Sequence, residues 1–531
     1  MHRNKSVDVH QFSMIPKADI PRSSFDAQKT YKTTFDAGYL VPVLVDEVLP
    51  GDTWNCKMTA FGRLATPLYP IMDNMIMESF FFFVPNRLVW NNWVKFMGQQ
   101  DNPGDSISYT VPQVTSPAGG YAVNSLQDYM GLPTAGQITG SNKVSHNALY
   151  TRAYNLIWNE WFRDENLQNS VVVDKGDGPD SASNYILLRR GKRKDYFTSS
   201  LPWPQKGASV TLPLGSKAPI AVDSLATQSI GVYNTVVGAN RYLNVLSGTY
   251  INTDSAGAGA PTSDRVLYAD LTQATAATIN QIRQSFQIQR LLERDARGGT
   301  RYTEILRAHF GVVSPDARLQ RPEYIGGGST PVNINPIAQT SATNVTGGST
   351  PQGNLAAMGT MLAHGHGFTY SAVEHGMIIG LVSVRADLTY QQGLQRMWSR
   401  KTRYDYYFPV FAYLGEQPVY QKEIYCTGTA ADDTVFGYQE RWGEYRYKPS
   451  QITGLFRSTA AGTLDGWHLS QKFTSAPTLN STFIEDNPPV DRIVAVGAAA
   501  NGKQFLFDAF FDIRMARPMH MFSVPGLIDH F

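Results

Sequence analysis

The sequence carries little charge for its length. Charged residues make up 17% of the 531 residues, whereas an average soluble protein has about 25%. Exposed charge is what normally keeps a large soluble surface hydrated and unassociated. We therefore expect much of the surface to be covered by other protein rather than by water.

Cysteine and long apolar runs are also scarce. The two cysteines, Cys56 and Cys426, exclude a disulfide framework and favour a reducing cytoplasm as the place of synthesis. The N-terminal residues lack the apolar core of a signal peptide. No apolar run approaches the length that crosses a bilayer, so we expect no membrane insertion.

The common catalytic motifs are missing. Gly191-Lys192 and Gly502-Lys503 are not followed by Ser or Thr, so neither forms a P-loop. There is no G-x-S-x-G elbow and no H-E-x-x-H zinc helix. The net charge of +2 does not by itself indicate a nucleic-acid-binding protein, so any such function depends on local patches.

Two short segments allow a metal-binding interpretation. His364, His366 and His375 cluster within HGHGFTYSAVEH, and imidazoles two apart on a regular strand share one face, where they could bind zinc. The acidic loop Asp174–Asp180 (DKGDGPD) lacks the odd-numbered carboxylate spacing of an EF-hand. We favour hydrogen-bonded histidines and an ordinary acidic turn, and predict neither a metal nor a cofactor.

What the chain has in abundance is aromatic residues and arginine. Aromatic residues make up 12% of the sequence, and 29 of the 46 basic residues are Arg. Interfaces between proteins are enriched in both and depleted in Lys. The run Phe80, Phe81, Phe82 and Phe83, ended by Pro85-Asn86, is typical of a core strand covered on both faces, because an exposed strand of this kind would aggregate.

Strand-length apolar runs separated by Pro, Gly, Asp and Asn occur at both ends of the chain, and they indicate an all-β fold. We predict a single eight-stranded antiparallel jelly roll with long loop insertions and a few short helices. Residues 1–35 are expected to form an N-terminal arm and residues 36–531 the jelly-roll domain. A surface insertion at 208–268, rich in Ala, Gly, Ser and Thr, is expected to interrupt that domain.

Three further elements are predicted from the local pattern. Helical spacing of apolar residues predicts helices at 152–168 and 278–299. The apolar run DYYFPVFAYL at 405–414 favours a strand.

Two basic clusters are the candidate functional residues. Cations that follow phosphates, together with aromatic rings that stack on bases, are the usual means of binding single-stranded nucleic acid, and the same residues serve as interface anchors. We therefore predict that the clusters face DNA or a neighbouring subunit. The candidates are Arg189, Arg190, Lys192, Arg193, Lys194, Arg396, Trp398, Arg400, Lys401 and Arg403.

Several long blocks of the chain resemble the major capsid protein of gokushoviruses, small tailless bacteriophages of the microvirus group. The resemblance runs from about residue 30 to the C-terminal MFSVPGLIDHF. The blocks that carry it include FDAGYLVPVLVDEVLPGDTW, RAYNLIWNEWFRDENL, LLERDARGGTRYTEILRAHFGVVSPDARLQRPEYIGG and HGMIIGLVSVRADLTYQQGLQRMWSR.

The resemblance implies a structural, non-enzymatic subunit of a small icosahedral shell that encloses circular single-stranded DNA. It implies assembly in the cytoplasm of a host bacterium with an internal scaffolding protein, a DNA pilot protein and a small basic DNA-binding protein. It further implies that the insertion at 208–268 forms a protrusion at the three-fold axis and meets a host-cell surface receptor.

The residues alone leave one other class of protein open. An aromatic-rich jelly roll could bind or cleave carbohydrate, with exposed Trp and Tyr stacking on sugars and a carboxylate pair hydrolysing the glycosidic bond. No spacing in the sequence identifies such a pair.

Overall fold

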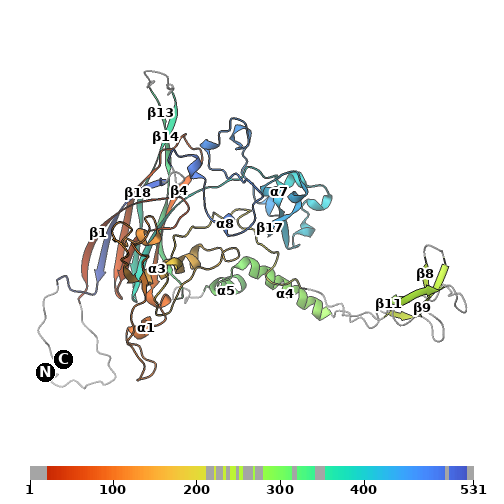
Figure 1. Ribbon diagram of the computed structural model, residues 1–531, viewed down its shortest axis with the longest axis horizontal. Helices are drawn as coiled ribbons and strands as arrows, with labels where there is room; N and C mark the ends of the chain where they lie inside the picture. Colours follow the sequence, from red (N-terminus) through yellow and green to blue (C-terminus); the bar gives the residue numbers. More distant parts are fainter. Residues whose placement is uncertain are drawn as a thin grey trace, which may run out of the picture. The chain divides into compact units, whose positions relative to one another are not determined.

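The computed structural model in Figure 1 describes residues 21–210, 279–313, 320–340, 353–496 and 502–522, with the backbone of five short strands between 220 and 269. The chain divides into two compact units. One comprises Met1–Pro204 and Thr300–Phe531, and the other comprises Gln205–Gly299.

Eight strands of the first unit pair in a nested order, in which the first strand of the chain lies beside the last. All of these pairs are antiparallel. They are β1 (Ser23–Phe35) with β18 (Phe505–Arg517), β2 (Val41–Val48) with β15 (Gly376–Ala386), β3 (Thr53–Leu64) with β14 (Leu355–Ser371), and β4 (Met75–Pro85) with β12 (Glu323–Pro331).

Further pairings join the four strand pairs into one curved sheet. β18 pairs with β3, β15 with β4, and β12 with β14, which gives the order β1-β18-β3-β14-β12-β4-β15-β2. β13 (Asn333–Ala338) extends β14 outside this path. Figure 1 shows these strands as long, curved ribbons. This rolled-up nested hairpin is a jelly roll, which confirms the predicted fold class.

The N-terminal strand lies inside the predicted arm. Ser23–Phe35 form β1, whose side chains at Phe25, Ala27 and Tyr31 pack against the core. Residues 1–20 of the predicted arm lie outside the described residues.

The phenylalanine run lies on β4 and faces two separate cores. Phe81 and Phe83 point into the roll, where Phe81 packs against Phe368 with ring centroids 5.0 Å apart. Phe82 points outward and belongs to a second core with Phe80 partly buried beside it. Because successive side chains of a strand alternate between faces, a continuous apolar run is what a strand with both faces covered requires.

Glycines lie beside Phe81 on the two neighbouring strands. Gly380 of β15 and Gly326 of β12 are the cross-strand partners of Phe81. A Cβ atom at Gly380 would lie 2.8 Å from the Phe81 ring, which is closer than packed carbon atoms approach. The Phe81 ring therefore fits because Gly380 lacks a side chain, while a Cβ atom at Gly326 would instead collide with the Gly367 carbonyl and Phe368 of β14.

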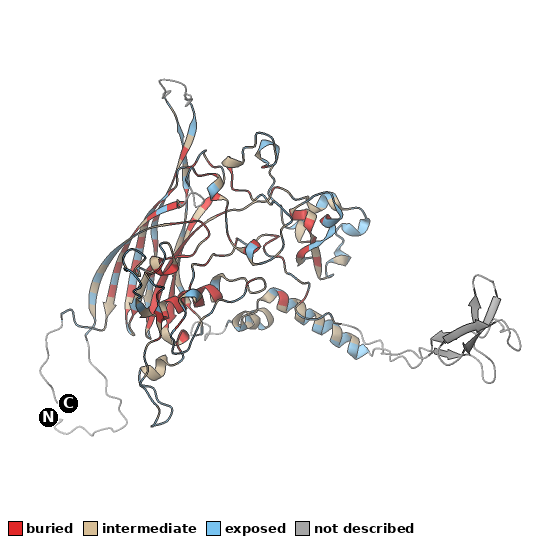
Figure 2. Cartoon of the chain, viewed as in Figure 1, coloured by how far each residue is buried: buried red, intermediate tan, exposed pale blue. Residues whose placement is uncertain are grey.

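A helical layer covers the outer face of β4 and β15. Helix α3 (Leu149–Ile157) carries buried Tyr154, whose hydroxyl donates to the Leu40 carbonyl over 2.9 Å. A π turn, η2 (Trp158–Phe162), continues the helix, and the Phe82 ring lies 5.6 Å from the ring of Trp161. Figure 2 shows buried residues along these strands and along α3. The helix predicted for 152–168 is confirmed in its first part and ends at Phe162.

The remaining elements of the first unit lie in the long connections between strands. The connection from β4 to β12 holds α1 (Trp93–Phe96), β5 (Gln113–Thr115), α2 (Leu126–Tyr129), β6 (Ser145–Asn147) and α5 (Tyr302–Phe310). The connection from β15 to β18 holds β16 (Glu416–Tyr420), α7 (Gln421–Ile424), β17 (Val435–Glu440) and α8 (Ser481–Ile484). Phe197, Phe436 and Phe483 form a third, smaller core with residues of the second connection.

The second unit contains the whole of the predicted insertion at 208–268. Its strands are β7 (Ile220–Val222), β8 (Gly231–Asn234), β9 (Ala239–Leu246), β10 (Tyr250–Asp254) and β11 (Leu267–Ala269). The side chains of residues 211–278 lie outside the described residues. Helix α4 (Ile279–Gly298) confirms the helix predicted for 278–299.

We predict that Phe81→Ala and Phe82→Ala each lower the free energy of unfolding by about 3–5 kcal/mol, since each removes a fully buried ring. Chemical denaturation of the isolated subunit, together with soluble yield, measures the loss. Phe61→Ala is the control, because Phe61 is 51% exposed on the same sheet. Equal stability of all three variants would contradict the assignment of β4 to two cores.

Candidate functional site: two basic clusters

Three of the five cations in the first basic cluster are buried or half-buried and make contacts within the subunit. The guanidinium of Arg189 stacks on the Tyr39 ring at 4.0 Å and donates to the Asp486 carbonyl over 3.0 Å. Arg190 forms an ion pair with Glu78 of β4, which also accepts from Arg385 over 2.7 Å. These arginines hold the connection that follows α3 against the sheet.

Lys192 is also buried, and the carboxyl group of Asp486 lies near its ammonium group. Its ammonium donates to Gln471 over 3.0 Å and lies 4.2 Å from the centre of the Phe483 ring. Burial lowers the pKa of Lys192 to about 8, although the nearby Asp486 carboxylate opposes this shift. Burial raises the pKa of Asp486 to about 7, against the effect of Arg190 and Lys192. A buried cation with these internal contacts is not available to a phosphate.

The other two cations of the first cluster are exposed and form ion pairs. Arg193 contacts Asp387 at 3.0 Å, and Lys194 contacts Asp164. Their charges are thus partly compensated within the subunit.

The second cluster is built around an internal ionic group. Arg396 donates to Glu423 over 3.0 Å, and Arg400 donates to Glu444 over 3.3 Å. Arg400 also stacks on the Tyr445 ring at 4.3 Å. Both arginine side chains are mostly buried. They therefore fix the backbone of this segment rather than present a free charge.

Between and after these two anchors, the intervening side chains point to solvent. Trp398 is 69% exposed on the 3-10 turn η5 (Arg396–Ser399). Lys401 and Arg403 are exposed, and neither forms an ion pair with any residue in the described ranges. The result is a surface where uncompensated cations lie among accessible rings. We refer to residues 396–413 as the aromatic loop.

The strand predicted for 405–414 is wrong. The segment contains the end of η6 (Arg403–Asp405) and the turn η7 (Pro409–Phe411), and its side chains are mostly exposed. Proline lacks the N–H that a central strand donates, so Pro409 interrupts the run. Its rings thereby become part of the aromatic loop, among them Tyr406 at 51% and Tyr413 at 98% exposure.

Arg441 lies beside the aromatic loop, and it was not among the candidate residues predicted from the sequence. It lines the same hollow as Lys401 and Arg400, stacks on the Trp442 ring at 4.8 Å, and has no ion pair with a described residue. The sequence RWGEYRYK places Arg441 among aromatic residues. It does not reveal that Arg441 lies beside Lys401, 40 residues earlier in the chain.

The histidine cluster does not form a shared face. A β-bulge between Ala363 and His366 shifts the register of β14, with Gly365 at φ 77°, so His364 is exposed while His366 is buried. The imidazole of His366 lies 2.8 Å from the Ser79 hydroxyl and 2.9 Å from the Thr330 hydroxyl. Because a bulge inserts one extra residue, residues two apart no longer point the same way.

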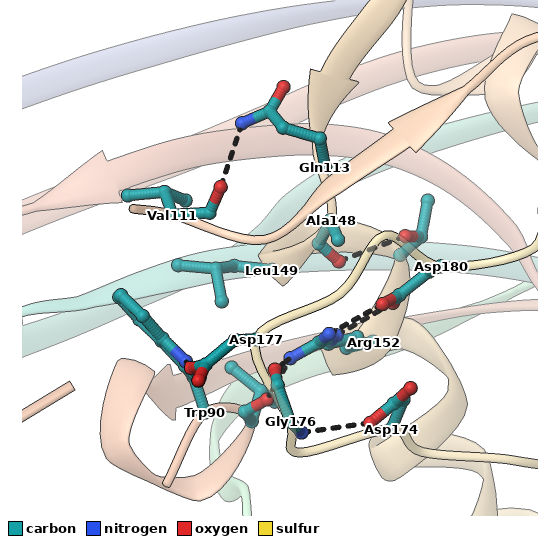
Figure 3. A network of polar contacts seen from close by, with 12 residues as sticks. Trp90, Val111, Gln113, Ala148, Leu149, Arg152, Asp174, Gly176, Asp177 and Asp180 are labelled. Atoms are coloured by element: carbon teal, nitrogen blue, oxygen red, sulfur yellow. Dashed lines mark hydrogen bonds and ion pairs between the residues drawn. The ribbon is translucent and has the colours of Figure 1, made fainter. Parts of the chain in front are cut away.

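The acidic loop Asp174–Asp180 is closed by protein groups, as Figure 3 shows. Asp180 is fully buried and accepts two hydrogen bonds from Arg152, at 2.7 and 2.5 Å. Asp177 accepts from the Trp90 indole over 2.7 Å, and the Gly176 carbonyl accepts from Arg152 over 2.9 Å. The loop is a packing element that locks α3 to its neighbours. The described residues contain no group of three acidic, His or Cys side chains placed to hold a metal ion.

Jelly rolls occur in viral capsid subunits, and also in lectin domains and cupins, so the comparison with known proteins decides between these classes. The chain belongs to the capsid protein (F protein) family, whose model matches residues 13–527. Among the part of the chain that the structure describes, no helix has the length and apolarity to cross a membrane.

Three curated relatives match almost the whole chain. Each is a capsid protein VP1, and each alignment covers 98% of this chain and 98% of the relative. The chain is 48% identical to the protein of Bdellovibrio phage phiMH2K, 46% to that of Chlamydia phage 1 and 34% to that of Spiroplasma virus 4. The resemblance to gokushovirus major capsid proteins is confirmed. The chain is a structural subunit of a virion shell and not an enzyme, so the carbohydrate-cleaving alternative is set aside.

We predict that acid weakens the fold through His366. Burial lowers the pKa of the folded His366 below that of the unfolded chain, which is about 6.5. As the pH falls below about 6.5, the imidazole of this histidine takes up a proton in the unfolded chain but stays neutral in the folded chain. The free energy of unfolding therefore decreases. Urea unfolding at about pH 7.5 and pH 5 measures this loss. His366→Gln should show a smaller loss, and an equal loss would refute the assignment.

Proposed function

We propose that shells of this subunit enclose circular single-stranded DNA and that the aromatic loop contacts that DNA. Membership of the capsid family supports shell assembly. The observation that favours DNA contact is the uncompensated charge of Lys401 and Arg403 beside the exposed ring of Trp398. Cations neutralise phosphates while the ring stacks on a base, and together they bind single strands without a sequence preference.

The candidate cations divide between two roles under this proposal. Arg189, Arg190 and Lys192, together with Arg396 and Arg400, hold the surface in place through internal contacts. Lys401 and Arg403 meet the DNA, with Arg441 beside them. Arg193 and Lys194, whose charges are compensated by acids, contribute less to DNA binding.

The remaining parts of the proposed function concern assembly and the host. We infer an icosahedral shell built in the bacterial cytoplasm with an internal scaffolding protein, a DNA pilot protein and a small basic DNA-binding protein. We further infer that the insertion at 208–268 forms a three-fold protrusion that binds a host-cell surface receptor. The separate compact unit Gln205–Gly299 supports this second inference, since binding residues are disproportionately found on connecting segments carried by a rigid scaffold.

We predict that the double variant Lys401→Ala with Arg403→Ala binds single-stranded DNA more weakly and with less salt dependence. Each lost phosphate contact reduces the slope of log affinity against log salt by about 0.7 for a single strand, so the slope should fall by about 1.4. Titration of a fluorescent oligothymidylate with purified subunits at several salt concentrations measures it.

The matched control for this prediction is Arg193→Ala with Lys194→Ala, which removes the same charge from ion-paired positions. Its salt slope should stay near that of the unmodified subunit. If the two double variants lose the same slope, net charge rather than the aromatic loop controls binding, and the site assignment fails.

For the host, we predict that particles in which residues 208–268 are replaced by a short Gly-Ser linker still assemble but no longer adsorb to susceptible cells. Electron microscopy checks assembly, and depletion of particles from a cell suspension measures adsorption. Normal adsorption by assembled variant particles would exclude the insertion as the attachment surface.

A further inference from the structure

A shallow groove lies where the outer face of β1, β3 and β18 meets the segment 123–131. Its floor and wall are apolar and accessible. Phe61 is 51% exposed, Leu506 52% and Val123 63%. The opposite face of the roll differs, because the α3 layer covers β4 and β15 there. The groove side of the roll has no comparable covering layer among the described residues.

The charges in the groove are balanced, which disfavours nucleic acid as its occupant. Two cations, Lys32 and Arg63, and two carboxylates, Asp128 and Asp508, line it. A polyanion gains nothing on balance from such a surface. Apolar side chains among charges of both signs are the composition of a contact with protein.

Two of these four charges lack an ion pair within the subunit. Lys32 and Asp508 contact each other across β1 and β18. Arg63 and Asp128 form no ion pair with a described residue; the Asp128 carboxylate accepts only the Asn124 backbone N–H, over 2.6 Å. The groove thus contains one cation and one carboxylate without an ion-pair partner among the described residues, together with exposed apolar side chains.

We propose that the groove is a contact between two copies of this chain, related by a two-fold axis. Such a contact brings the same patch of each copy together, so residue i meets j and j meets i. Arg63 of each copy would then face Asp128 of the other, while the apolar side chains bury one another at the centre. The proposal rests on shell assembly, and it does not depend on DNA enclosure or on host attachment.

Charge reversal with mixed copies tests this pairing. Arg63→Asp alone places two carboxylates opposite each other at every contact, and Asp128→Lys alone places two cations there. Like charges across an interface cost several kcal/mol, so each variant expressed alone should yield at least about tenfold fewer particles. Co-expression of the two variants restores an opposite charge at both positions of a mixed contact. Particle yield should therefore return towards that of the unmodified chain.

The control for this test is Lys57→Asp, which makes the same charge change on the same strand outside the groove. Co-expression with Asp128→Lys should not improve its particle yield. Thermal unfolding of each purified variant separates failed folding from failed association. Rescue of Lys57→Asp, or unchanged assembly by both groove variants when the unmodified chain forms particles, overturns the proposal. If the unmodified chain forms no particles with its neighbouring phage genes, shell assembly itself fails instead.

A second comparison applies if Asp128→Lys does not fold. Phe61→Asp should abolish particles, whereas Leu362→Asp should permit them. Leu362 is the cross-strand partner of Phe61 and is 63% exposed, but it lies outside the groove. Particles from Phe61→Asp in normal yield would exclude the groove as a contact between copies.

Discussion

The structure depends on burying both faces of one strand. β4 sends Phe81 and Phe83 into the roll and Phe82 into the outer layer, so neither the sheet nor the helical layer is complete without the other. A ring of this size contributes several kcal/mol when fully buried. The connection between β4 and β12 carries α3, which covers the outer face on which Phe82 lies.

Ionic groups connect the outer connections to this centre. Glu78 lies on β4 itself and binds Arg190 and Arg385 from two other segments. Arg152 ties α3 to Asp180 in the same way, at full burial. Breaking such a buried pair leaves a lone charge in a poorly polar setting, which costs far more than an exposed pair is worth. Much of the arginine excess therefore serves to hold long loops on a β scaffold.

The sequence pattern predicted the fold class because each jelly-roll strand is a short apolar run with a turn signal at its end. It also placed α4 and most of α3, because the apolar spacing of a helix is local information. Which cations are buried and which are exposed could not be predicted, because Arg190 and Arg193 differ only in the residues that the folded chain brings near them. The exposed turns at 405–414 carried the same apolar residues as a strand, and only the position of Pro409 distinguished them. The bulge at Gly365 turns the side chains of His364 and His366 to different faces of β14. It depends on the pairing of β14 with β3, and no periodic pattern in the sequence predicts it.

The nested strand order has a consequence for the timing of folding. β18 lies between β1 and β3, yet it begins at Phe505 of a 531-residue chain. While the ribosome is still making the chain, β1 has no neighbour and β3 has an open edge. Contacts that join the two ends of a chain form late, because the intervening loop must close first. The sheet cannot be completed before β18 has been made, so a product truncated before Phe505 would leave β1 without a partner strand and β3 with an open edge.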